Sequence, residues 1–409
     1  MRILSVTETY APFLEFGGPP VKVRALAKGL AGRGHEVTVL SADWGIETRL
    51  SAAEAAGAGR SSFGWSQRES GVTAIYLPTW LRFRSITWNP AVRRFCRERL
   101  LDFDVAHLYG LYDFLGPAVA SAFAQRNIPY VLEPIGMFVP IVRSFWLKRI
   151  YHAWFGRQLF EGASAIIATS EQEAAELAGG GVARDKIALR RNGVEAPASW
   201  PERGVFRKRL GLADNARLIL FLGRLSIKKS PDLLLQAFAA ISKVPAAQSL
   251  SLVFAGPDEA GMTAGLTRMA AQLGVTPQVH FAGPIFGDAK WAAYRDADVF
   301  VLPSQNENFG NTAAEAVAAG TPVVATERCG IAPILAGVAG LVVPHDAGAL
   351  ARAIQSLVSN PELHARLVAG CSAVAARLGW EGPVLEMEAL YNKLAIKRPA
   401  SAESGSSER

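Results

Sequence analysis

The sequence predicts an α/β protein built from two doubly wound domains, each with a parallel sheet covered by helices on both faces. Short apolar segments alternate with amphipathic helical segments along most of the chain, which is the pattern typical of such sheets. The chain also has 409 residues, more than a single hydrophobic core usually holds. Because the alternation falls into two series, we expect two sheets.

The expected strands of the first series lie at residues 3–6, 37–40, 105–108, 130–132 and 165–168, and those of the second at 218–222, 252–255, 279–282, 299–302, 322–325 and 340–343. A short polar segment with Pro197 and Pro201 separates the two series. We therefore place the first domain at 1–197 and the second at 198–379.

Two segments lack the alternating pattern. Residues 46–70 are rich in Ala, Gly and Ser, and we expect them to form a mobile insertion. Residues 398–409 are polar and contain repeated serines, and we expect a disordered tail.

Composition limits the class of protein. Half of the residues are hydrophobic, which predicts a globular chain. No apolar run approaches the roughly 18 to 20 residues that cross a bilayer, and residues 1–6 are better interpreted as a first strand than as a signal peptide. Cys96, Cys329 and Cys371 are far apart and lack His or Cys neighbours at metal-binding spacing. We therefore expect a reduced cytoplasmic protein without structural zinc.

The net charge of +7 is unevenly distributed. Six arginines and one acidic residue lie between Arg82 and Arg99, and residues 134–160 contain four basic residues and no acidic one. Within the second stretch, residues 145–157 have apolar side chains at helical spacing, which predicts an amphipathic helix with a basic side. Such a helix either docks on a membrane surface or an anionic acceptor, or packs on the core with a solvated back. No nucleic-acid-binding motif accompanies the charge.

The segment 299–322 carries the most informative motif. It joins an apolar strand, a polar turn that contains Gly310, and an Ala-rich helix. The first turn of a helix has unpaired backbone N–H groups and partial positive charge, so it suits a phosphate group. Glu307 in the turn and Glu315, about one helical turn inside the helix, could accept hydrogen bonds from sugar hydroxyls on either side of that phosphate. The alternative is an ordinary strand–helix unit with two solvated glutamates.

Ligands of open parallel sheets bind beyond the carboxyl ends of the strands. In the first domain, Gly17-Gly18 follows the first strand, and His107 and Glu133 come at the ends of later ones. The glycine pair allows close approach to an anion or forms a plain loop, and the histidine could simply be satisfied by the backbone. In the second domain, Arg224 and Lys229 follow the first strand and could clamp a diphosphate or remain solvated.

Taken in order, these motifs resemble the retaining GT-B glycosyltransferases of family 4, and the resemblance covers nearly the whole chain. The matching segments are Gly17-Gly18, Gly34-His35-Glu36-Val37-Thr38-Val39, His107, Ala168-Thr169-Ser170-Glu171, Asn192-Gly193-Val194, Gly223-Arg224-Leu225 with Lys229, and the paired-glutamate stretch from Glu307. The resemblance implies the GT-B fold, in which two Rossmann-like domains face each other across a cleft. It also implies a last helix at 380–396 that crosses back onto the first domain.

The resemblance implies a role for each catalytic candidate. Arg224 and Lys229 would neutralise the donor diphosphate, and His107 would lie near the anomeric centre. Glu315 would hold the ribose hydroxyls, and Glu307 would hold hydroxyls of the transferred sugar. The further donor-binding candidates are Gly17, Gly18, Asn308, Phe309, Gly310, Asn311 and Thr312, with Gly283 and Ile285 near the base.

The sequence departs from the family at two places. Arg190-Arg191 precedes Asn192 where many members have an apolar residue and proline. Glu133 stands where members often have histidine. Glu133 and the basic residues Arg143 and Lys148 are the candidate acceptor-side residues.

The implied reaction is transfer of a hexose, with retention, from a UDP- or GDP-sugar to a lipid-linked or polysaccharide acceptor. It would need no metal or other cofactor and would serve cell-surface, exopolysaccharide or lipopolysaccharide synthesis. We expect a cytoplasmic enzyme with possible peripheral association with the inner face of the membrane.

Three other interpretations remain open at this stage. A metal-dependent GT-A transferase would use an Asp-x-Asp motif, and Asp102-Phe103-Asp104 and Asp296-Ala297-Asp298 match its letters, although both precede strands. A sugar-nucleotide epimerase or hydrolase would use similar phosphate contacts. A non-catalytic nucleotide-binding protein or a dehydrogenase is the third, but the spacing of Gly29, Gly32 and Gly34 does not fit a dinucleotide fingerprint.

Overall fold

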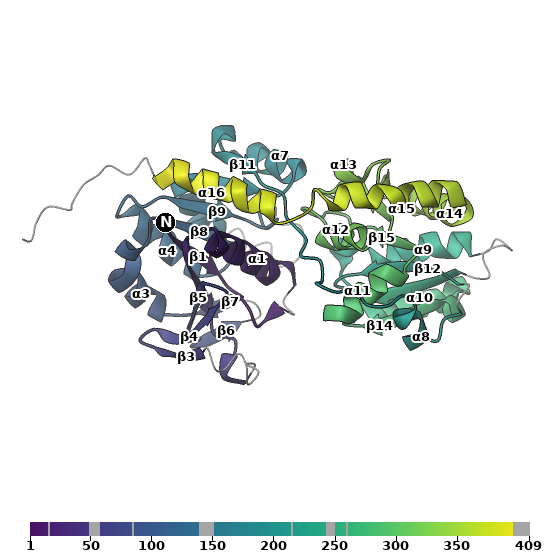
Figure 1. Ribbon diagram of the computed structural model, residues 1–409, viewed down its shortest axis with the longest axis horizontal. Helices are drawn as coiled ribbons and strands as arrows, with labels where there is room; N and C mark the ends of the chain where they lie inside the picture. Colours follow the sequence, from purple (N-terminus) through teal and green to yellow (C-terminus); the bar gives the residue numbers. More distant parts are fainter. Residues whose placement is uncertain are drawn as a thin grey trace, which may run out of the picture. The chain divides into compact units, whose positions relative to one another are not determined.

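The computed structural model describes residues 1–14, 17–48, 58–83, 86–138, 151–213, 216–242, 250–258 and 261–395. The chain forms two compact units, each with its own sheet (Figure 1). The N-terminal unit comprises Met1–Arg191 and Trp380–Arg409, and the C-terminal unit comprises Asn192–Gly379. The prediction of two doubly wound α/β domains is confirmed. The first unit ends at Arg191, whereas the sequence placed the boundary at 197.

The N-terminal sheet has the strand order β11-β10-β9-β8-β1-β2-β5-β4-β3. Its parallel strands are β1 (Arg2–Thr7), β2 (Glu36–Ala42), β5 (Val72–Leu77), β8 (Val105–Tyr109), β9 (Tyr130–Glu133), β10 (Ala165–Ala168) and β11 (Ile187–Leu189). The antiparallel edge consists of β3 (Ala58–Ser61) and β4 (Gly64–Glu69). The order of strands reverses between β1 and β8.

The expectation of a mobile insertion at 46–70 is wrong for the described part of that segment. β4 pairs with β5 from Trp65 opposite Tyr76 to Glu69 opposite Val72, so the segment extends the sheet. The composition of the segment did not predict strands because Ala, Gly and Ser have weak strand propensity. Cross-strand pairing with the buried β5 overrides that local preference.

Helices cover both faces of the N-terminal sheet. They are α1 (Gly18–Gly32), α3 (Ala91–Arg99), α4 (Leu115–Ala124), α6 (Arg157–Gly162), α7 (Glu171–Gly179) and α16 (Glu381–Ala395), with short turns η2 (Ile46–Thr48), η3 (Leu100–Asp102), η4 (His152–Gly156) and η5 (Arg184–Lys186). Successive strand residues point to opposite faces. Ile3 therefore packs in the core under α1 and α16, and Leu4 packs in the core under α3, α4, α6 and α7.

The last helix, α16, belongs to the N-terminal unit although it follows the C-terminal unit in sequence (Figure 1). It packs directly on α1. A β-carbon added to Gly29 would lie 2.4 Å from Cγ2 of Val384, so only glycine allows this approach of the two helices.

The C-terminal sheet is entirely parallel and has the order β14-β13-β12-β15-β16-β17. Its strands are β12 (Arg217–Leu222), β13 (Leu250–Ala255), β14 (Val279–Gly283), β15 (Val299–Leu302), β16 (Val323–Thr326) and β17 (Gly340–Val343). The strand order reverses between β12 and β15. In open α/β sheets this switch point is where ligands bind.

The helices of the C-terminal unit are α8 (Val205–Arg209), α9 (Pro231–Ile241), α10 (Met262–Leu273), α11 (Gly287–Asp296), α12 (Asn311–Ala318), α13 (Ala332–Leu335), α14 (Ala347–Ser359) and α15 (Pro361–Ala375), with turns η6 (Ile227–Lys229) and η8 (Thr276–Gln278). Leu218 and Leu220 pack toward α11 and α12, whereas Ile219 and Phe221 pack toward α9 and α14. This alternation buries both faces of the sheet.

Part of the predicted amphipathic helix at 145–157 falls outside the described residues, and its described end is η4, which leads into α6. Within the described residues, no helix combines the length and apolar character needed to cross a bilayer. Cys96, Cys329 and Cys371 are buried free thiols.

Candidate functional site

The turn between β15 and α12 depends on Gly310. This residue has a φ of 105°, and a β-carbon there would lie 2.9 Å from Ile331 and 3.0 Å from Leu302. Both the backbone conformation and the space therefore require glycine. α12 starts at the next residue, Asn311, and no side chain caps it. Its first backbone N–H groups form the kind of N-terminus that binds anions.

Glu307 lies in this turn and is held from both sides. Its backbone N–H donates to Arg328 O at 3.0 Å, and its own carbonyl accepts from Gly330 N at 2.9 Å. Its carboxylate forms an ion pair with Lys229, and both side chains keep about a fifth of their surface exposed, 18% and 22%. The structure thus joins two of the predicted catalytic residues as one partly exposed pair.

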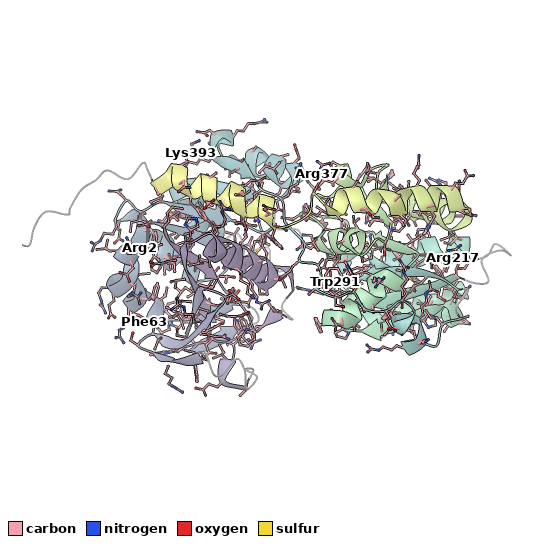
Figure 2. All side chains as sticks on the ribbon, viewed as in Figure 1. Arg2, Phe63, Arg217, Trp291, Arg377 and Lys393 are labelled. Atoms are coloured by element: carbon pink, nitrogen blue, oxygen red, sulfur yellow. The ribbon has the colours of Figure 1, made fainter. Side chains whose placement is uncertain are left out.

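Glu315 faces α11 rather than open solvent. Its carboxylate accepts hydrogen bonds from Lys290 Nζ at 2.7 Å and from the Tyr294 hydroxyl at 2.9 Å. Lys290 also lies over the ring of Trp291, which is labelled in Figure 2. Sequence reasoning missed these two partners of Glu315. Their spacing of i and i+4 on α11, which places both on one helix face, was the available signal.

Arg224 and Lys229 both follow the carboxyl end of β12. The chain leaves the strand through Gly223, whose carbonyl oxygen would lie 2.0 Å from a β-carbon on Gly256, so the two loops are in close contact. Arg224 is exposed. Because β12 and β15 flank the switch point, Arg224, Lys229 and Glu307 gather at the edge where ligands of this sheet bind.

Two asparagines add polar groups at the start of α12. Asn192 Nδ2 donates to Asn311 Oδ1 at 3.0 Å, so the Asn192-Gly193-Val194 segment contacts the predicted donor loop. Asn308 Nδ2 is buried and has no hydrogen-bond partner among the described residues. Phe309 is buried in the core, so only its backbone is available to a ligand. An unpaired buried donor at this position is a group that a ligand oxygen could satisfy.

The remaining donor-site candidates lie at other loop positions. Gly283 ends β14 with a φ of 67°, and Ile285 is buried just before α11. In the N-terminal unit, Gly17 has a φ of 99° and precedes the first turn of α1, which Gly18 begins. The predicted roles of these residues stay predictions.

His107 lies inside β8, not beyond it, and its side chain is fully buried. Its Nδ1 is hydrogen-bonded to the Tyr391 hydroxyl at 2.6 Å, and its ring stacks on Tyr109 with 3.9 Å between ring centroids. Its Nε2 is 3.4 Å from Glu133 Oε2 without making a hydrogen bond. Burial lowers the pKa of His107, which keeps the ring neutral. Its predicted place near the anomeric centre stays a prediction.

Glu133 occupies the centre of a buried ionic cluster. Lys22 Nζ donates to Glu133 Oε1 at 2.5 Å, and Arg190 Nη2 donates to both carboxylate oxygens at 2.7 and 2.6 Å. Lys22, Glu133 and Arg190 are each at most 3% exposed. Burial alone would raise the pKa of Glu133, but the charges of Arg190 and Lys22 hold it well below its ordinary value. The described role of Glu133 is therefore to balance two buried cations.

Glu133 and Arg190 are also the two places where the sequence departs from the family it resembles. In the structure the departures face each other as one ion pair, in which the single nitrogen Nη2 of Arg190 donates to both carboxylate oxygens of Glu133. Each charge requires the other, because an unpaired charge in a protein interior is strongly unfavourable. The other acceptor-side candidates, Arg143 and Lys148, lie outside the described residues.

The carboxylates of the two Asp-x-Asp segments have structural partners. Asp102 pairs with Arg99, and Asp104 pairs with Arg2 at 3.0 Å. Asp296 accepts hydrogen bonds from the backbone N–H groups at the start of α8. Asp298 pairs with Arg207 and Arg217, and Arg217 and Arg2 are labelled in Figure 2. These contacts account for all four carboxylates without a ligand.

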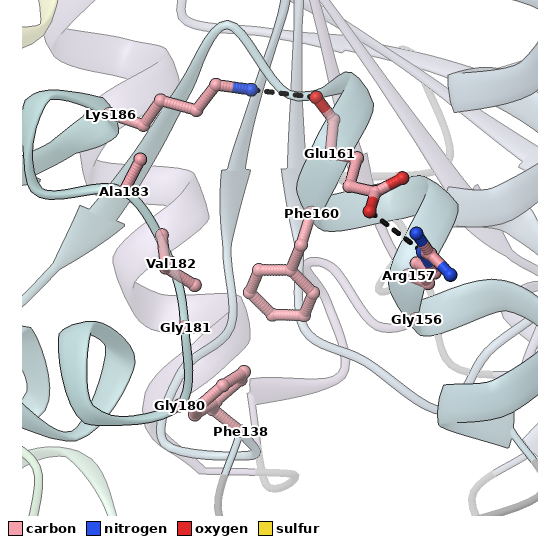
Figure 3. A pocket seen from close by; sticks show the side chains of 10 residues that line it. All are labelled: Phe138, Gly156, Arg157, Phe160, Glu161, Gly180, Gly181, Val182, Ala183 and Lys186. Carbon is pink, nitrogen blue, oxygen red and sulfur yellow. Dashed lines mark hydrogen bonds and ion pairs between the residues drawn. The ribbon is translucent and has the colours of Figure 1, made fainter.

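The N-terminal unit contains a cavity of about 520 Å³, and Figure 3 shows the side chains that line it. Phe138 and Phe160 meet there edge to face, with 5.1 Å between ring centroids. Glu161 accepts from Arg157 Nε at 2.8 Å through its side chain and from Lys186 Nζ at 2.7 Å through its backbone. None of the predicted site residues is among the described residues that line this cavity.

Known proteins of similar sequence cover part of the chain. A D-inositol 3-phosphate glycosyltransferase of Thermomonospora curvata is 35% identical over 251 residues, which are 57% of this chain and 58% of that protein. The protein of the same name from Streptomyces scabiei is 36% identical over 234 residues, 55% of this chain and 52% of that protein. The chain thus spans a little over half the length of these relatives.

Solved structures match nearly the whole fold. Sucrose-phosphate synthase from Thermosynechococcus elongatus has a TM-score of 0.73 at 22% identity, covering 97% of this chain and 100% of that one. HepE of Anabaena, in complex with UDP and glucose, has a TM-score of 0.74 at 19% identity with the same coverage. At these identities the likeness shows the fold.

Two family models divide the chain between them. The model described as glycosyl transferase 4-like domain matches residues 17–193, and the model described as glycosyl transferases group 1 matches residues 202–370. The two matched ranges correspond to the two units. Together with the shared fold, they identify the family of the chain. The chain belongs to the GT-B glycosyltransferases of the family 4 type.

Proposed function

We propose that the protein transfers a hexose from a UDP- or GDP-sugar, with retention of the anomeric configuration, to a lipid-linked or polysaccharide acceptor. The observation that carries the proposal is the grouping of Lys229, Glu307 and the uncapped start of α12 at the switch point of the C-terminal sheet. Cations, carboxylates and an anion-binding helix end are the groups that a nucleotide diphosphate sugar requires.

The leaving nucleotide is stabilised by positive charge in this scheme. Arg224 and Lys229 neutralise the diphosphate as the bond between C1 and the phosphate oxygen breaks. The backbone N–H groups at the start of α12 contribute further partial positive charge. Because these groups are positioned before the reaction, little reorganisation is needed when the charge develops.

The two glutamates have separate tasks. Glu315, held by Lys290 and Tyr294, accepts hydrogen bonds from the ribose hydroxyls. Glu307, held through its backbone, accepts hydrogen bonds from the hexose. The acceptor oxygen bonds to C1 on the face from which the phosphate departs, and the acceptor proton passes to the departing phosphate oxygen. No covalent intermediate on Glu307 is part of this scheme.

Relatives support the choice of donor and widen the choice of acceptor. HepE of Anabaena binds UDP and glucose in its solved complex. The sequence relatives are named for D-inositol 3-phosphate, so a phosphorylated polyol belongs among the acceptors to be tested. A place in exopolysaccharide or lipopolysaccharide synthesis, with the enzyme in the cytoplasm near the membrane, forms part of the proposal.

The first experiment identifies the donor. A panel of UDP- and GDP-sugars is compared by thermal shift, since a ligand that binds the folded protein raises the melting temperature with its occupancy. The nucleotide sugar that stabilises most is then incubated with lipid-linked, oligosaccharide and inositol phosphate acceptors. The anomeric configuration of the product reports retention or inversion. Release of free sugar or its epimer without dependence on acceptor would instead favour a hydrolase or epimerase.

Site variants then test the assignment of residues. We expect Arg224→Ala and Glu307→Ala each to lower the transfer rate by roughly 100-fold or more, the size of effect seen when a charge-stabilising group is removed. Arg217→Ala is the matched control, because Arg217 begins the same strand, β12, at its opposite end. If both site variants transfer at the wild-type rate, the assignment is wrong.

A further inference from the structure

A two-stranded hairpin projects apolar side chains from the N-terminal unit. It consists of β6 (Leu81–Phe83) and β7 (Ile86–Trp88) and is separate from the nine-stranded sheet (Figure 1). Trp80, Leu81 and Phe83 are 74%, 72% and 64% exposed, and Trp88 is 39% exposed. Soluble proteins rarely leave several large apolar residues exposed together unless the surface binds something.

Leu81, Phe83 and Trp88 share one face of the hairpin. Leu81 is opposite Trp88, and Phe83 is opposite Ile86, so these side chains point to the same side. Arg82, between Leu81 and Phe83, points to the other side, where its guanidinium lies 4.2 Å from the ring centroid of Trp44. Arg82 therefore rests on the unit and Trp88 packs edge to face on Phe114, whereas Leu81 and Phe83 stay largely exposed.

The base of the hairpin is held by specific hydrogen bonds. The buried side chain of Asn89 donates from Nδ2 to the carbonyl oxygens of Leu77 and Pro78 and to Thr79 Oγ1, at 3.0 to 3.1 Å. The backbone N–H of Trp80 also donates to Trp88 O at 3.0 Å. These hydrogen bonds fix the position of the hairpin that carries the apolar face.

The hairpin lies at the carboxyl edge of the N-terminal sheet. It follows β5 directly, and it contacts the loops after β2 and β8 through Trp44 and Phe114. The ring of Phe114 is 5.4 Å from that of Trp88 and 6.1 Å from that of Phe155, whose neighbour Trp154 is 72% exposed. This is the edge at which ligands of a parallel sheet bind.

Positive charge lies close to the hairpin in the sequence. Two residues separate β7 from α3, whose Arg93 and Arg97 are exposed. Arg94 and Arg99 of the same helix pair with Glu98 and Asp102. Aromatic residues flanked by arginines favour the boundary between lipid headgroups and acyl chains, where the rings are half buried and the cations contact phosphates.

We propose that the β6–β7 hairpin docks the N-terminal unit on an anionic lipid surface, with Trp80, Leu81 and Phe83 inserted at the interface and Arg93 and Arg97 of α3 contacting the headgroups. The occupant is a lipid bilayer because these exposed apolar residues are followed in the sequence by a stretch in which arginines far outnumber acidic residues. The inference rests on the proposed function in one respect: it identifies where a lipid-linked acceptor would reach the carboxyl edge of this sheet.

Co-sedimentation with vesicles tests the proposal. The full-length protein is mixed with phosphatidylcholine vesicles that contain 30% or no phosphatidylglycerol, a composition chosen for the test. We expect binding to the anionic vesicles. The triple variant Trp80→Ser, Leu81→Ser, Phe83→Ser should bind them at least roughly tenfold more weakly. The matched control replaces exposed apolar residues elsewhere, Val205→Ser with Leu385→Ser, and should bind as the wild type does.

A charge variant tests the second half of the surface. Arg93→Ser with Arg97→Ser should weaken binding to anionic vesicles several-fold and reduce its dependence on salt. Circular dichroism and the melting temperature show whether each variant is folded. If the triple variant is unfolded, Phe83→Ser alone replaces it, since this position is solvent-exposed and the change adds no charge.

Two results would overturn the proposal. One is wild-type protein that does not bind anionic vesicles. The other is a folded triple variant that binds them as well as the control does. If the wild type instead forms dimers that the triple variant loses, the face belongs to a second copy. Vesicle binding in a protein that no UDP- or GDP-sugar stabilises would leave the docking surface intact and remove the proposed donor.

Discussion

The two units have charged residues at corresponding edges of their sheets, but the exposure of these residues to solvent differs. In the C-terminal unit the pairs Lys229–Glu307 and Lys290–Glu315 keep about a fifth of their side-chain surface exposed, 18 to 24%. In the N-terminal unit the cluster around Glu133 is at most 3% exposed. Partly exposed pairs can exchange partners with a ligand, whereas a fully buried cluster mainly supports the fold.

The position of each residue relative to the end of its strand produces this difference in exposure. Glu307 lies beyond the end of β15 at Leu302, in a turn that leaves the sheet. Glu133 is the last residue of β9, and His107 is two residues short of the end of β8. A side chain within a doubly covered parallel strand points into a core. Proximity to a strand end is therefore a weak predictor of access to a ligand.

The largest expected effect is on stability and comes from Glu133→Ala. Removing this carboxylate leaves Lys22 and Arg190 buried without a counter-charge, which should destabilise the N-terminal unit by about 3–5 kcal/mol. Glu307→Ala, which removes a partly exposed carboxylate, should change stability by less than about 1 kcal/mol. Thermal and denaturant unfolding of both variants measure the contrast.

Unfolding of a two-unit chain need not be a single transition, so tryptophan fluorescence and circular dichroism should be followed together. The triple variant Lys22→Met, Glu133→Met and Arg190→Met provides the control. It removes all three charges of the cluster and should recover part of the lost stability, because neutral side chains avoid the desolvation of buried charges. Equal losses for Glu133→Ala and Glu307→Ala would contradict the comparison of the two units.

The sequence predicted the fold and the turn at Gly310 better than the contacts of Glu133 and His107. Apolar alternation identified both sheets, and Gly310 predicted the turn between β15 and α12, because both are local features of the chain. The pairing of Glu133 with Arg190 joins residues 57 positions apart and has no local signature. The strands at 58–69 were missed for a related reason, since their stability comes from pairing with β5.

A second effect concerns pH and the carboxyl group of Glu8, which follows β1. Its Oε1 is buried without a hydrogen-bond partner among the described residues. Burial and the nearby Asp113 raise the pKa of Glu8 to about 9, against the opposing charge of Arg82. A raised carboxyl pKa gives stability that is complete below about pH 4.5 and is lost as pH rises to about 9.

Glu8→Gln should remove this pH dependence. The variant should match the wild type near pH 5 and exceed its stability at pH 9 by roughly 2–4 kcal/mol, a discounted value because the side chain is partly exposed. Melting temperatures from pH 5 to pH 9 measure the difference between the two proteins. Parallel curves for wild type and variant would show that Glu8 titrates normally.

A smaller effect is expected from Tyr391→Phe. The hydroxyl of Tyr391 on α16 is the hydrogen-bond partner of His107 Nδ1 at 2.6 Å. Removing it leaves a buried ring nitrogen unpaired, which should cost about 1–3 kcal/mol. Since the ring of Phe fills the same space, packing of α16 should be preserved.

The readout for Tyr391→Phe is unfolding together with the NMR titration of His107. The pKa of His107 is lowered mainly by burial, so the ring should stay neutral in the variant across the neutral pH range. If the His107 ring titrates near its ordinary pKa in the folded variant, the Tyr391 hydroxyl, and not burial, is what lowers the pKa of His107. Phe123→Leu in the opposite core of the same unit serves as a packing control.

The last comparison makes the same substitution in each unit, and Lys290→Met in the C-terminal unit has the smallest expected effect on stability. Lys290→Met leaves Glu315 with the Tyr294 hydroxyl and a partly exposed environment, so stability should change by less than about 1 kcal/mol. Lys22→Met removes a cation from the sealed cluster, and although Arg190 still pairs with Glu133, the loss should be about 2–4 kcal/mol. Lys290→Met should act instead on donor binding, raising the KM for the nucleotide sugar several-fold while kcat changes little, because Glu315 loses one of the two groups that orient it. Equal stability losses in the two variants would mean that burial does not distinguish the lysines, and an unchanged KM would remove Glu315 from the nucleotide site.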